Sequence, residues 1–397
     1  MYNQYGYCII AIQIGIYNTH INTFGKMFFS DFRSNLRTKN FVSILLIVFL
    51  CACSNDNEYY HVDSIKELHI GFCEDTIKGE LFVSSDTRPN GIERRDSILI
   101  VMGTSYSQNL FDFYNVKSKE KILSFGRIGH ARNEFINAPV YSYFDINGDD
   151  LMLYFPDENS TKVLNFKETI KQKKGIFEKP QTHKYDGENY FFINKDTVIV
   201  RKSVSYIDPR DEVFFPPNFT IYTGNTAKNI SIYPKIIKSN NYGLLHFLYS
   251  SIVRVKPDKT KIVESLCLLD IINIIDIKTG KVVGIKESNT YGFEDIEKKS
   301  KDPDIERKVN VYTHGMYLTD KHIFLLQDRC TVSELRGNEV SSIPTLLVLD
   351  WDGELTGMVC LDKDIYSFVC DEEASALYGF DGEGSIYKYN IYKYLNK

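Results

Sequence analysis

The end of the chain, residues 343–391, constrains the fold most, because it holds one complete unit of short strands. Residues 345–361 form an apolar run, a Trp-Asp-Gly turn and a second run that alternates apolar and polar residues, which is the pattern of a β-hairpin. Residues 364–391 add three more strand-like runs, and nothing in the stretch is typical of a helix. Strands of about five to eight residues, spaced about ten apart, favour a β-sandwich, a barrel or a propeller.

Earlier parts of the chain repeat this unit. Hairpins with the same order of parts recur at residues 110–126, 219–234 and 272–286, with a weaker copy at 162–173. The complementary pattern, an inner strand and the strand that follows it, recurs at residues 140–155, 188–201, 311–327 and 365–380. The repeats predict six units of four strands, a number within the range that β-propellers use. The predicted units start near residues 77, 135, 185, 242, 311 and 364.

The last predicted unit has only three strands before the chain ends. Residues 64–72 alternate in the manner of a strand and could supply the fourth. A ring closed in this way has no free sheet edges. We therefore predict an all-β fold, a six-bladed β-propeller over residues 64–397 in which an N-terminal strand closes the last blade.

Composition agrees with a strand-rich globule and excludes one class of partner. The 397 residues include 27 Tyr and 26 Phe but only 11 Pro, which favours aromatic strands over a disordered chain. The formal net charge of -5 offers no basic surface of the kind that binds nucleic acid. We therefore predict no nucleic-acid partner.

The N-terminus has the pattern of an export signal. A basic region with Arg33, Arg37 and Lys39 precedes an apolar run at residues 41–52. A run of about a dozen residues is too short for a membrane span, which needs about 20, and suits the core of a signal peptide. We predict that residues 1–52 are a leader. An extra apolar patch ahead of the basic region suggests that translation starts at Met27, the alternative being an unusually long leader.

Residues 50–52 read Leu-Cys-Ala and stand directly before Cys53. This order resembles the bacterial lipoprotein signal, which implies that Cys53 becomes the diacylated first residue of the mature protein. The alternative is an ordinary secretory signal in which Cys53 has no special role. Residues 53–63 are expected to form a tether, and Ser54 resembles the residue found in lipoproteins sorted to the outer membrane. The sequence leaves open whether the protein faces the periplasm or the cell surface.

The segment between residues 125 and 155 resembles a known connector. Its pattern is similar to the Gly-Gly-acid-Phe-Pro connector of NHL-type propeller repeats, at Gly126, Gly129, Glu134, Phe135, Pro139 and Asp145. Residues 67–394 as a whole resemble the TolB-like six-bladed β-propeller lipoproteins of Bacteroidetes, which implies the same fold and an envelope location. His130 and Ala131 depart from the Gly and Pro that are common there.

Four charged or titratable side chains of this connector are our candidate ligand-binding residues. They lie on the connector between the outer strand of one blade and the inner strand of the next, beside the expected mouth of the central channel: Arg127, His130, Arg132 and Glu134. Their chemistry suits recognition of an anion or a carboxylate. The alternative is structural, with Glu134 and an arginine pairing with the backbone or with each other to hold the connector.

No local catalytic motif is present in the sequence. Gly-x-Ser-x-Gly, His-Glu-x-x-His, a phosphate-binding Gly-Lys-Ser/Thr loop and Cys-x-x-Cys are all missing. Asp145, Asn147 and Asp149 resemble the start of a calcium loop, but Asp150 and Pro156 stand where the loop needs Gly and Glu. An Asn-Gly hairpin turn at residues 147–148 explains the same pattern and is preferred. We predict no catalytic residue, metal or cofactor.

Cysteines and tyrosines admit structural explanations. Five cysteines follow the predicted anchor, at Cys73, Cys267, Cys330, Cys360 and Cys370. They are expected to be mostly free core residues, and a bridge between Cys360 and Cys370 is not expected. The C-terminal tyrosines could form a glycan-stacking surface, but burial between blades is preferred. These are Tyr366, Tyr378, Tyr387, Tyr389, Tyr392 and Tyr394.

Together these patterns favour a non-enzymatic protein. We predict a lipid-anchored outer-membrane propeller that binds a ligand, either a protein or a small molecule. Its expected partners are the membrane, through the anchor, and that ligand. The alternative is a lyase or hydrolase with an active site in the central channel, which would need no local motif.

Overall fold

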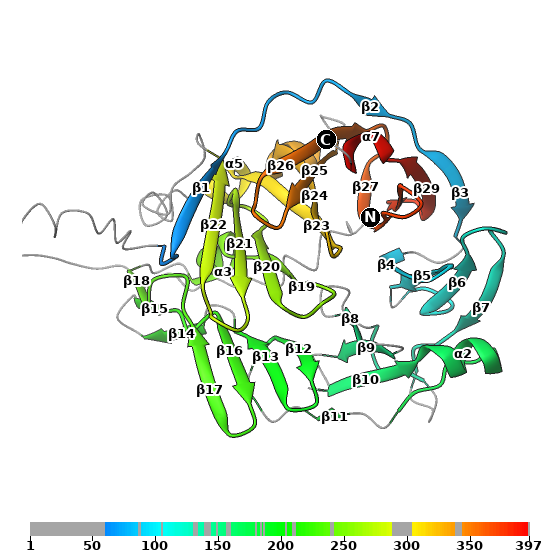
Figure 1. Ribbon diagram of the computed structural model, residues 1–397, viewed down its shortest axis with the longest axis horizontal. Coiled ribbons are helices and arrows are strands. Elements are labelled where there is room, and N and C mark those ends of the chain that lie inside the picture. Colours follow the sequence, from blue (N-terminus) through cyan, green and yellow to red (C-terminus); the bar gives the residue numbers. More distant parts are fainter. Residues whose placement is uncertain are drawn as a thin grey trace, which may run out of the picture.

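Among the residues that the computed structural model describes, six β-sheets stand in a ring around a common axis, which confirms the predicted all-β propeller (Figure 1). A smaller three-stranded sheet lies beside the ring. Each blade has at least four strands, and two of the described blades have five. The structure describes residues 60–85, 89–104, 106–129, 134–138, 144–147, 150–155, 160–178, 181–182, 185, 187–202, 205–208, 212–238, 242–287, 304–337 and 344–395.

The first three blades follow the chain from the inner strand outward. Blade one contains β4 (Pro89–Arg95), β5 (Ile98–Gly103), β6 (Phe111–Asn115) and β7 (Lys121–Phe125). Blade two contains β8 (Phe144–Asn147), β9 (Asp150–Phe155), β10 (Ser160–Asn165) and β11 (Gln181–Thr182). Blade three contains β12 (Asn189–Asn194), β13 (Thr197–Arg201), β16 (Phe219–Thr223) and β17 (Thr226–Ile230). The small sheet contains β14 (Ser205–Asp208), β15 (Glu212–Phe214) and β18 (Ile236–Lys238).

The last three blades each take a strand from the N-terminal segment. Blade four contains β19 (Ser251–Val255), β20 (Lys261–Leu266), β21 (Ile271–Asp276), β22 (Val282–Glu287) and β1 (Ser64–Leu68). Blade five contains β23 (Asn310–Leu318), β24 (His322–Thr331), β25 (Thr345–Asp350), β26 (Leu355–Leu361) and β2 (Thr76–Ile77). Blade six contains β27 (Ile365–Asp371), β28 (Ala376–Asp381), β29 (Ser385–Asn390) and β3 (Glu80–Ser84). Short helices are α2 (Phe166–Gln172), α3 (Tyr242–Leu248), α5 (Ile305–Lys308), α6 (Val332–Gly337) and α7 (Tyr392–Leu395).

The core lies between neighbouring blades, which explains why the middle strands are apolar on both faces. In β25, Leu346 and Val348 pack into a cluster with residues of blade six, whereas Leu347 and Leu349 pack into a cluster with residues of blade four. Successive side chains of a strand point to opposite faces, so a strand with a blade on either side needs apolar residues at every position. The run at residues 345–350 meets that requirement.

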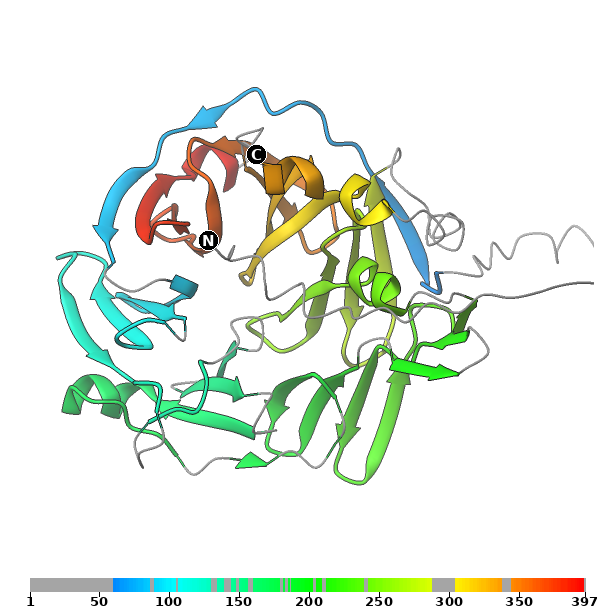
Figure 2. The ribbon, with the colours of Figure 1, turned by 180° about the vertical axis from the view of Figure 1, so that it is seen from behind.

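The N-terminal segment runs along the outside of blades four, five and six (Figures 1 and 2). β1 pairs in parallel with β22, β2 pairs in parallel with β26, and β3 pairs antiparallel with β29. An N-terminal strand therefore closes the last blade as predicted, but that strand is β3 and not residues 64–72. Phe82 explains the choice, because it is 5% exposed and packs edge-on against Tyr378 with ring centroids 5.2 Å apart.

Three further details of the repeat prediction were wrong. The fourth unit begins at β19 and not near residue 242, which is the first residue of the helix α3. The second strand expected in the weak copy at residues 162–173 is the helix α2, because Asn165 accepts a hydrogen bond from the backbone N–H of Glu168 and caps a helical turn. The first unit begins at β4 and not near residue 77, since Ile77 belongs to β2. The hairpin expected around residues 147–148 is confirmed, with Asn147 opposite Asp150 in the β8–β9 pair.

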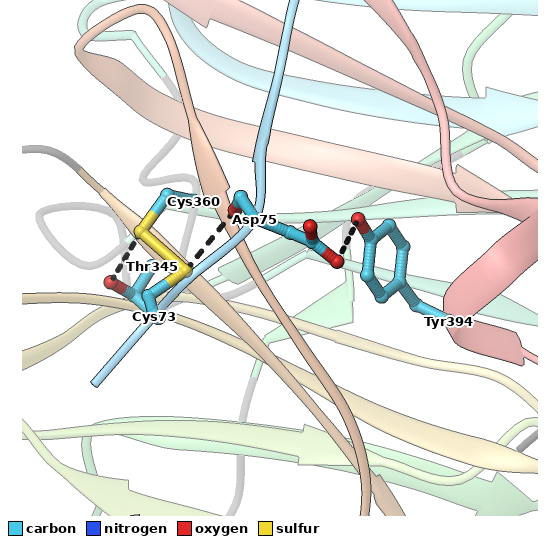
Figure 3. Close-up of a disulfide and its surroundings, with 5 residues drawn as sticks. All are labelled: Cys73, Asp75, Thr345, Cys360 and Tyr394. Carbon is cyan, nitrogen blue, oxygen red and sulfur yellow. Dashed lines mark hydrogen bonds between the residues drawn. A yellow bond between two sulfur atoms is a disulfide. The ribbon is translucent and has the colours of Figure 1, made fainter. Parts of the chain in front are cut away.

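A disulfide joins Cys73 to Cys360 across 287 positions, with Cα atoms 6.1 Å apart (Figure 3). Cys73 lies between β1 and β2, and Cys360 lies in β26. The Thr345 hydroxyl oxygen lies 3.7 Å from the Cys360 sulfur, and the Tyr394 hydroxyl donates to the Asp75 carboxylate at 3.4 Å. The bridge therefore attaches the N-terminal segment covalently to blade five.

The remaining cysteines agree with the prediction. Cys370 is a buried free thiol, so the expected absence of a bridge between Cys360 and Cys370 is confirmed. Cys267 and Cys330 are also free. The sequence did not reveal the partner of Cys73, because only the closed ring brings it beside Cys360.

Replacing Cys73 with serine is expected to lower the free energy of unfolding by about 2–4 kcal/mol, because loss of a cross-link returns conformational freedom to the unfolded chain. Urea unfolding of the wild type and Cys73→Ser measures the change. Cys330→Ser, which removes a half-buried thiol outside the bridge, is the matched control. A reductant should shift the wild-type midpoint and leave that of Cys73→Ser in place; a wild type indifferent to the reductant would contradict the bridge.

The structure places no helix long and apolar enough for a membrane span among the residues that it describes. The leader, the proposed lipidation site Cys53 and most of the predicted tether lie outside the described residues.

Candidate functional site

One face of the propeller carries the turns that lead from the outer strand of each blade to the inner strand of the next, and we call it the connector face. In an antiparallel blade the ends of the second and fourth strands, and the starts of the first and third, all lie on this face. Residues that are far apart in the sequence can therefore meet there. The candidate sites described below are all on the connector face.

The predicted connector between blades one and two lies only partly in the described residues. Arg127 is exposed, and its carbonyl oxygen accepts a hydrogen bond from the N–H of Phe135 at 2.8 Å. Glu134 packs over Gly129, where an added Cβ would lie 1.9 Å from a carboxylate oxygen. This close approach fits the structural role considered above for Glu134. His130 and Arg132 lie outside the described residues.

A small hollow opens elsewhere on the connector face, at the junction of blades three and four. It is lined by side chains from the end of β13, from the segment before β16 and from the segments after β17 and α3. Its volume is about 10 Å³, close to the space that one water molecule needs. The lining residues are Arg201, Lys202, Phe215, Pro216, Asn218, Tyr233 and Tyr249.

Aromatic rings form one wall of the hollow. The ring of Tyr249 packs edge-on against Phe215 at 4.8 Å and against Tyr233 at 4.9 Å between centroids. Asn218 also lines the hollow, and its side-chain oxygen accepts from the backbone N–H of Ile232 at 2.7 Å. The hollow therefore combines aromatic faces with polar groups, as small-molecule sites do.

Arg201, which lines the hollow, forms a buried charge pair with Glu264. Their side chains are 10% and 1% exposed, and the guanidinium Nε lies 3.6 Å from a Glu264 oxygen. Arg201 also donates to Ser251 at 2.7 Å and to Asn189 at 3.4 Å, and it pairs with Glu188 at 3.4 Å. Because its donors are engaged within the protein, Arg201 holds blades three and four together.

Glu264 is also the centre of a hydrogen-bonded network of neutral groups. It accepts from the Tyr233 hydroxyl at 2.9 Å, from Ser251 at 3.0 Å and from the Asn273 side-chain amide at 3.1 Å. Burial, followed by the charge of Glu264, raises the pKa of Tyr233 far above its ordinary value. Tyr233 therefore stays protonated and donates to Glu264.

A second cluster lies at the junction of blades four and five. Asp270 is 4% exposed, and burial together with the adjacent Glu287 carboxyl raises its pKa to about 8, although the charge of Arg329 opposes the shift. Arg329 donates to Glu287 at 3.0 Å and to Gln327 at 3.1 Å. Asp270 therefore tends to keep its proton near neutral pH, beside the ion pair of Glu287 and Arg329.

His314 lies between the inner strands of blades five and six. Its Nε2 is 2.9 Å from the carbonyl oxygen of Ile365, and its Nδ1 is 2.9 Å from a carboxylate oxygen of Asp328 in an ion pair rather than a directed hydrogen bond. Both neighbours can only accept, so the ring is best satisfied with both nitrogens protonated. Burial lowers the pKa of His314, but Asp328 and the Ile365 carbonyl raise it more, and the result lies above the ordinary value.

These clusters do not assemble a nucleophile. Burial, with the charges of Asp328 and Glu334, raises the pKa of the Cys330 thiol to about 12, so the thiol stays protonated and reacts poorly. Burial raises the pKa of Cys370 as well. In the described ranges, no group of three or more His, Cys, Asp and Glu side chains could hold a metal ion.

The tyrosine prediction is confirmed for part of the set. Tyr378, Tyr389 and Tyr394 are 2%, 0% and 3% exposed, as expected for rings between blades. Tyr392 differs, because it lies on α7 and is 64% exposed.

Our sequence analysis did not find the network around Arg201. A signal was present, since Glu264 interrupts the apolar run of β20 and a charge there has to be paired. Its partner Arg201 is 63 positions earlier, at the end of a strand in another blade. Only the arrangement of the blades shows that the two side chains meet.

The raised pKa of His314 predicts a pH dependence of stability. Its contribution is complete below the unfolded pKa near 6.5 and is lost as the pH rises through the higher folded pKa. Hydrogen bonds to a charged group predict that His314→Gln costs about 2 kcal/mol at pH 6. The cost should shrink by pH 9, as urea unfolding of both proteins at each pH would measure. A cost that is independent of pH would show that His314 is neutral throughout.

Comparison with known proteins identifies the scaffold. The model of the TolB-like 6-blade propeller-like family matches residues 73–373. No curated protein matches the chain.

Solved structures with a similar arrangement share little sequence with the chain. A Bacteroides fragilis protein described as exported is 11% identical, with 83% of this chain and 99% of that one covered and a TM-score of 0.48. The hydrazine synthase of Kuenenia stuttgartiensis is 14% identical, with 75% of each chain covered and a TM-score of 0.38. The computationally designed Ika8 protein is 7% identical, with 76% and 83% covered and a TM-score of 0.39. Likenesses of this degree say nothing about function.

Proposed function

We propose that this chain, which belongs to the TolB-like 6-blade propeller-like family, is an exported lipoprotein whose propeller binds a ligand at the cell envelope. The family match accounts for the scaffold. The lipid on Cys53, the outer-membrane location and the binding of a protein or small molecule are the parts that we propose.

The disulfide between Cys73 and Cys360 is the observation that best supports export. Disulfides persist in oxidising compartments such as the bacterial periplasm and the cell surface, and are rare in the cytosol. The basic and apolar pattern of residues 27–52 independently favours passage across the inner membrane. Cys53, directly after that pattern, is the residue that a lipoprotein would modify.

The hollow at the junction of blades three and four supports binding rather than catalysis. Its wall contains the aromatic rings of Phe215 and Tyr249 together with polar groups, and the Arg201 guanidinium that also lines it is engaged in contacts within the protein. Its small volume fits one projecting group of a larger ligand. We therefore propose that it holds one water-sized group, such as a hydroxyl, that projects from a partner protein or a small molecule.

The anchor is tested by expressing the full precursor and its Cys53→Ser variant in a bacterial host. The wild type is expected to enter the membrane fraction and to gain the mass of a diacylglyceryl group at Cys53. The variant should lose both properties. Membrane association that survives Cys53→Ser would rule out this anchor.

Binding is tested by a pull-down from detergent-solubilised envelope, followed by a thermal-shift screen of small molecules. Lys202→Ala, at the hollow, should weaken any captured partner or shift, whereas Lys195→Ala, on an exposed turn of the same blade, should not. The pair Arg127→Ala and Arg132→Ala tests the connector prediction in the same assay. If the arginine variants lost binding with an unchanged melting temperature while Lys202→Ala kept binding, the binding site would be at the connector and not at the hollow.

A further inference from the structure

The described chain begins at a fixed point on the outer rim, at the junction of blades three and four. The Tyr60 hydroxyl donates to Asn273 at 2.5 Å and fills the space beside Gly284, where an added Cβ would lie 2.1 Å from that hydroxyl. Next along the chain, the N–H of His61 donates to the carbonyl of Ile232 at 2.7 Å. The start of the propeller is therefore tied to blades three and four before β1 runs along the rim (Figure 1).

The distance from this point to the proposed anchor is short. Cys53 is seven residues before Tyr60. A fully extended chain spans at most about 3.6 Å per residue, so the two residues are at most about 25 Å apart. A domain of this size has a radius of gyration of about 20 Å and is roughly 50 Å across. The anchor therefore holds one side of the ring close to the lipid.

That side of the ring is basic although the whole chain has a net charge of -5. Four exposed lysines surround the entry point, and we call them the basic rim: Lys228, Lys235, Lys278 and Lys281. The Lys228 ammonium lies beside Lys278 and Lys281, because it donates to the carbonyl of Thr279 at 2.5 Å in the turn between β21 and β22. Lys235 is three residues after Ile232, whose carbonyl accepts from the N–H of His61 at the entry point.

Two acids close to the basic rim are tied to the backbone. Asp63 accepts from the N–H of Val282 at 2.7 Å, and Asp276 accepts from the N–H of Thr279 at 2.7 Å. Those hydrogen bonds lower the pKa of Asp276, so its charge remains, but its position is fixed beside the turn. The lysine side chains project from strand and turn positions that are exposed.

We propose that the basic rim rests on the phospholipid leaflet that holds the acyl chains of Cys53, so that the propeller stands edge-on to the membrane. Lysines beside a lipid anchor are attracted to anionic headgroups, and the anchor supplies the first of the two signals that stable attachment needs. The inference rests on the lipid anchor proposed above. In this orientation both faces of the ring, including the hollow on the connector face, stay open to soluble partners.

The test measures energy transfer from the protein to labelled lipid. The lipidated full chain is placed in vesicles of phosphatidylethanolamine and phosphatidylglycerol that contain an acceptor-labelled lipid. A donor dye is attached through a non-canonical residue at position 231, beside the basic rim, or at position 118, in the β6–β7 turn across the ring (Figure 2). Transfer from position 231 is expected to exceed that from position 118 several-fold.

Charge reversal shows whether the lysines of the basic rim, and not the tether alone, set the orientation on the membrane. Lys278→Glu with Lys281→Glu should reduce the difference between the two dye positions, whereas Lys117→Glu with Lys119→Glu, in a turn of blade one, should leave it unchanged. Equal transfer from both positions in vesicle-bound protein would show a face-down propeller and overturn the orientation alone. If the wild type failed to float with the vesicles, just as Cys53→Ser should, both the anchor and the orientation would be overturned.

Discussion

Replacing Arg201 with methionine is expected to destabilise the protein by about 3–5 kcal/mol, because it leaves Glu264 as a buried charge without its cationic partner. The Glu264 side chain is 1% exposed, so water cannot replace the guanidinium. The substitution also removes the donor to Ser251 at the start of β19. Urea unfolding followed by circular dichroism would measure the loss.

Two variants show whether the charge or the packing causes that loss. Arg201→Met combined with Glu264→Gln should recover most of the stability, because the amide is neutral and still accepts from Tyr233. Arg307→Met, on an exposed part of α5, should stay within about 0.5 kcal/mol of the wild type. If the double variant were as unstable as Arg201→Met, lost packing and not an unpaired charge would be the cause.

Replacing Phe82 with alanine should cost about 3–5 kcal/mol, the usual range for a buried phenylalanine. Phe82 is 5% exposed and is the side chain of β3 that packs on Tyr378 in blade six. The loss is expected to loosen blade six first, because β3 is its outermost strand. Hydrogen exchange of the amides in β29 would detect that loosening together with the fall in the unfolding free energy.

The matched control for Phe82 is its neighbour. Leu81 is in the same strand but is 54% exposed, so Leu81→Ala should have a small effect on both measurements. Equal losses for the two variants would mean that the backbone pairing of β3, and not the packing of Phe82, closes the ring.

Local patterns predicted the strands well because each blade is made from contiguous hairpins. Every hairpin pattern except the one at residues 162–173 corresponds to paired strands, and there the capping side chain of Asn165 turned the chain into a helix. The closing strand was placed too early, since residues 64–68 and 80–84 both alternate in the manner of strands. In the structure they differ in partner, since β1 pairs with β22 of blade four, whereas β3 pairs with β29 and buries Phe82 against Tyr378.

The sites were harder to predict because they are made between blades. Arg201 and Glu264, or His314 and the carbonyl of Ile365, meet only when neighbouring sheets pack side by side. The Cys73–Cys360 bridge depends on the same closure. The connector residues came from a local motif, and of these Arg127 and Glu134 lie in the described part, away from the hollow.

The pairing of β3 with β29 has a consequence for the order in which the protein folds. β3 is among the first strands of the propeller to be synthesised, and its partner is the last strand of the propeller. Blades one to five can form as they emerge, but β3 must wait unpaired until the C-terminus arrives. Contacts between such distant residues form slowly, and an unpaired strand edge invites aggregation during the wait. Completion of the ring is therefore the final and slowest step, and the one at which a chaperone would be of most use.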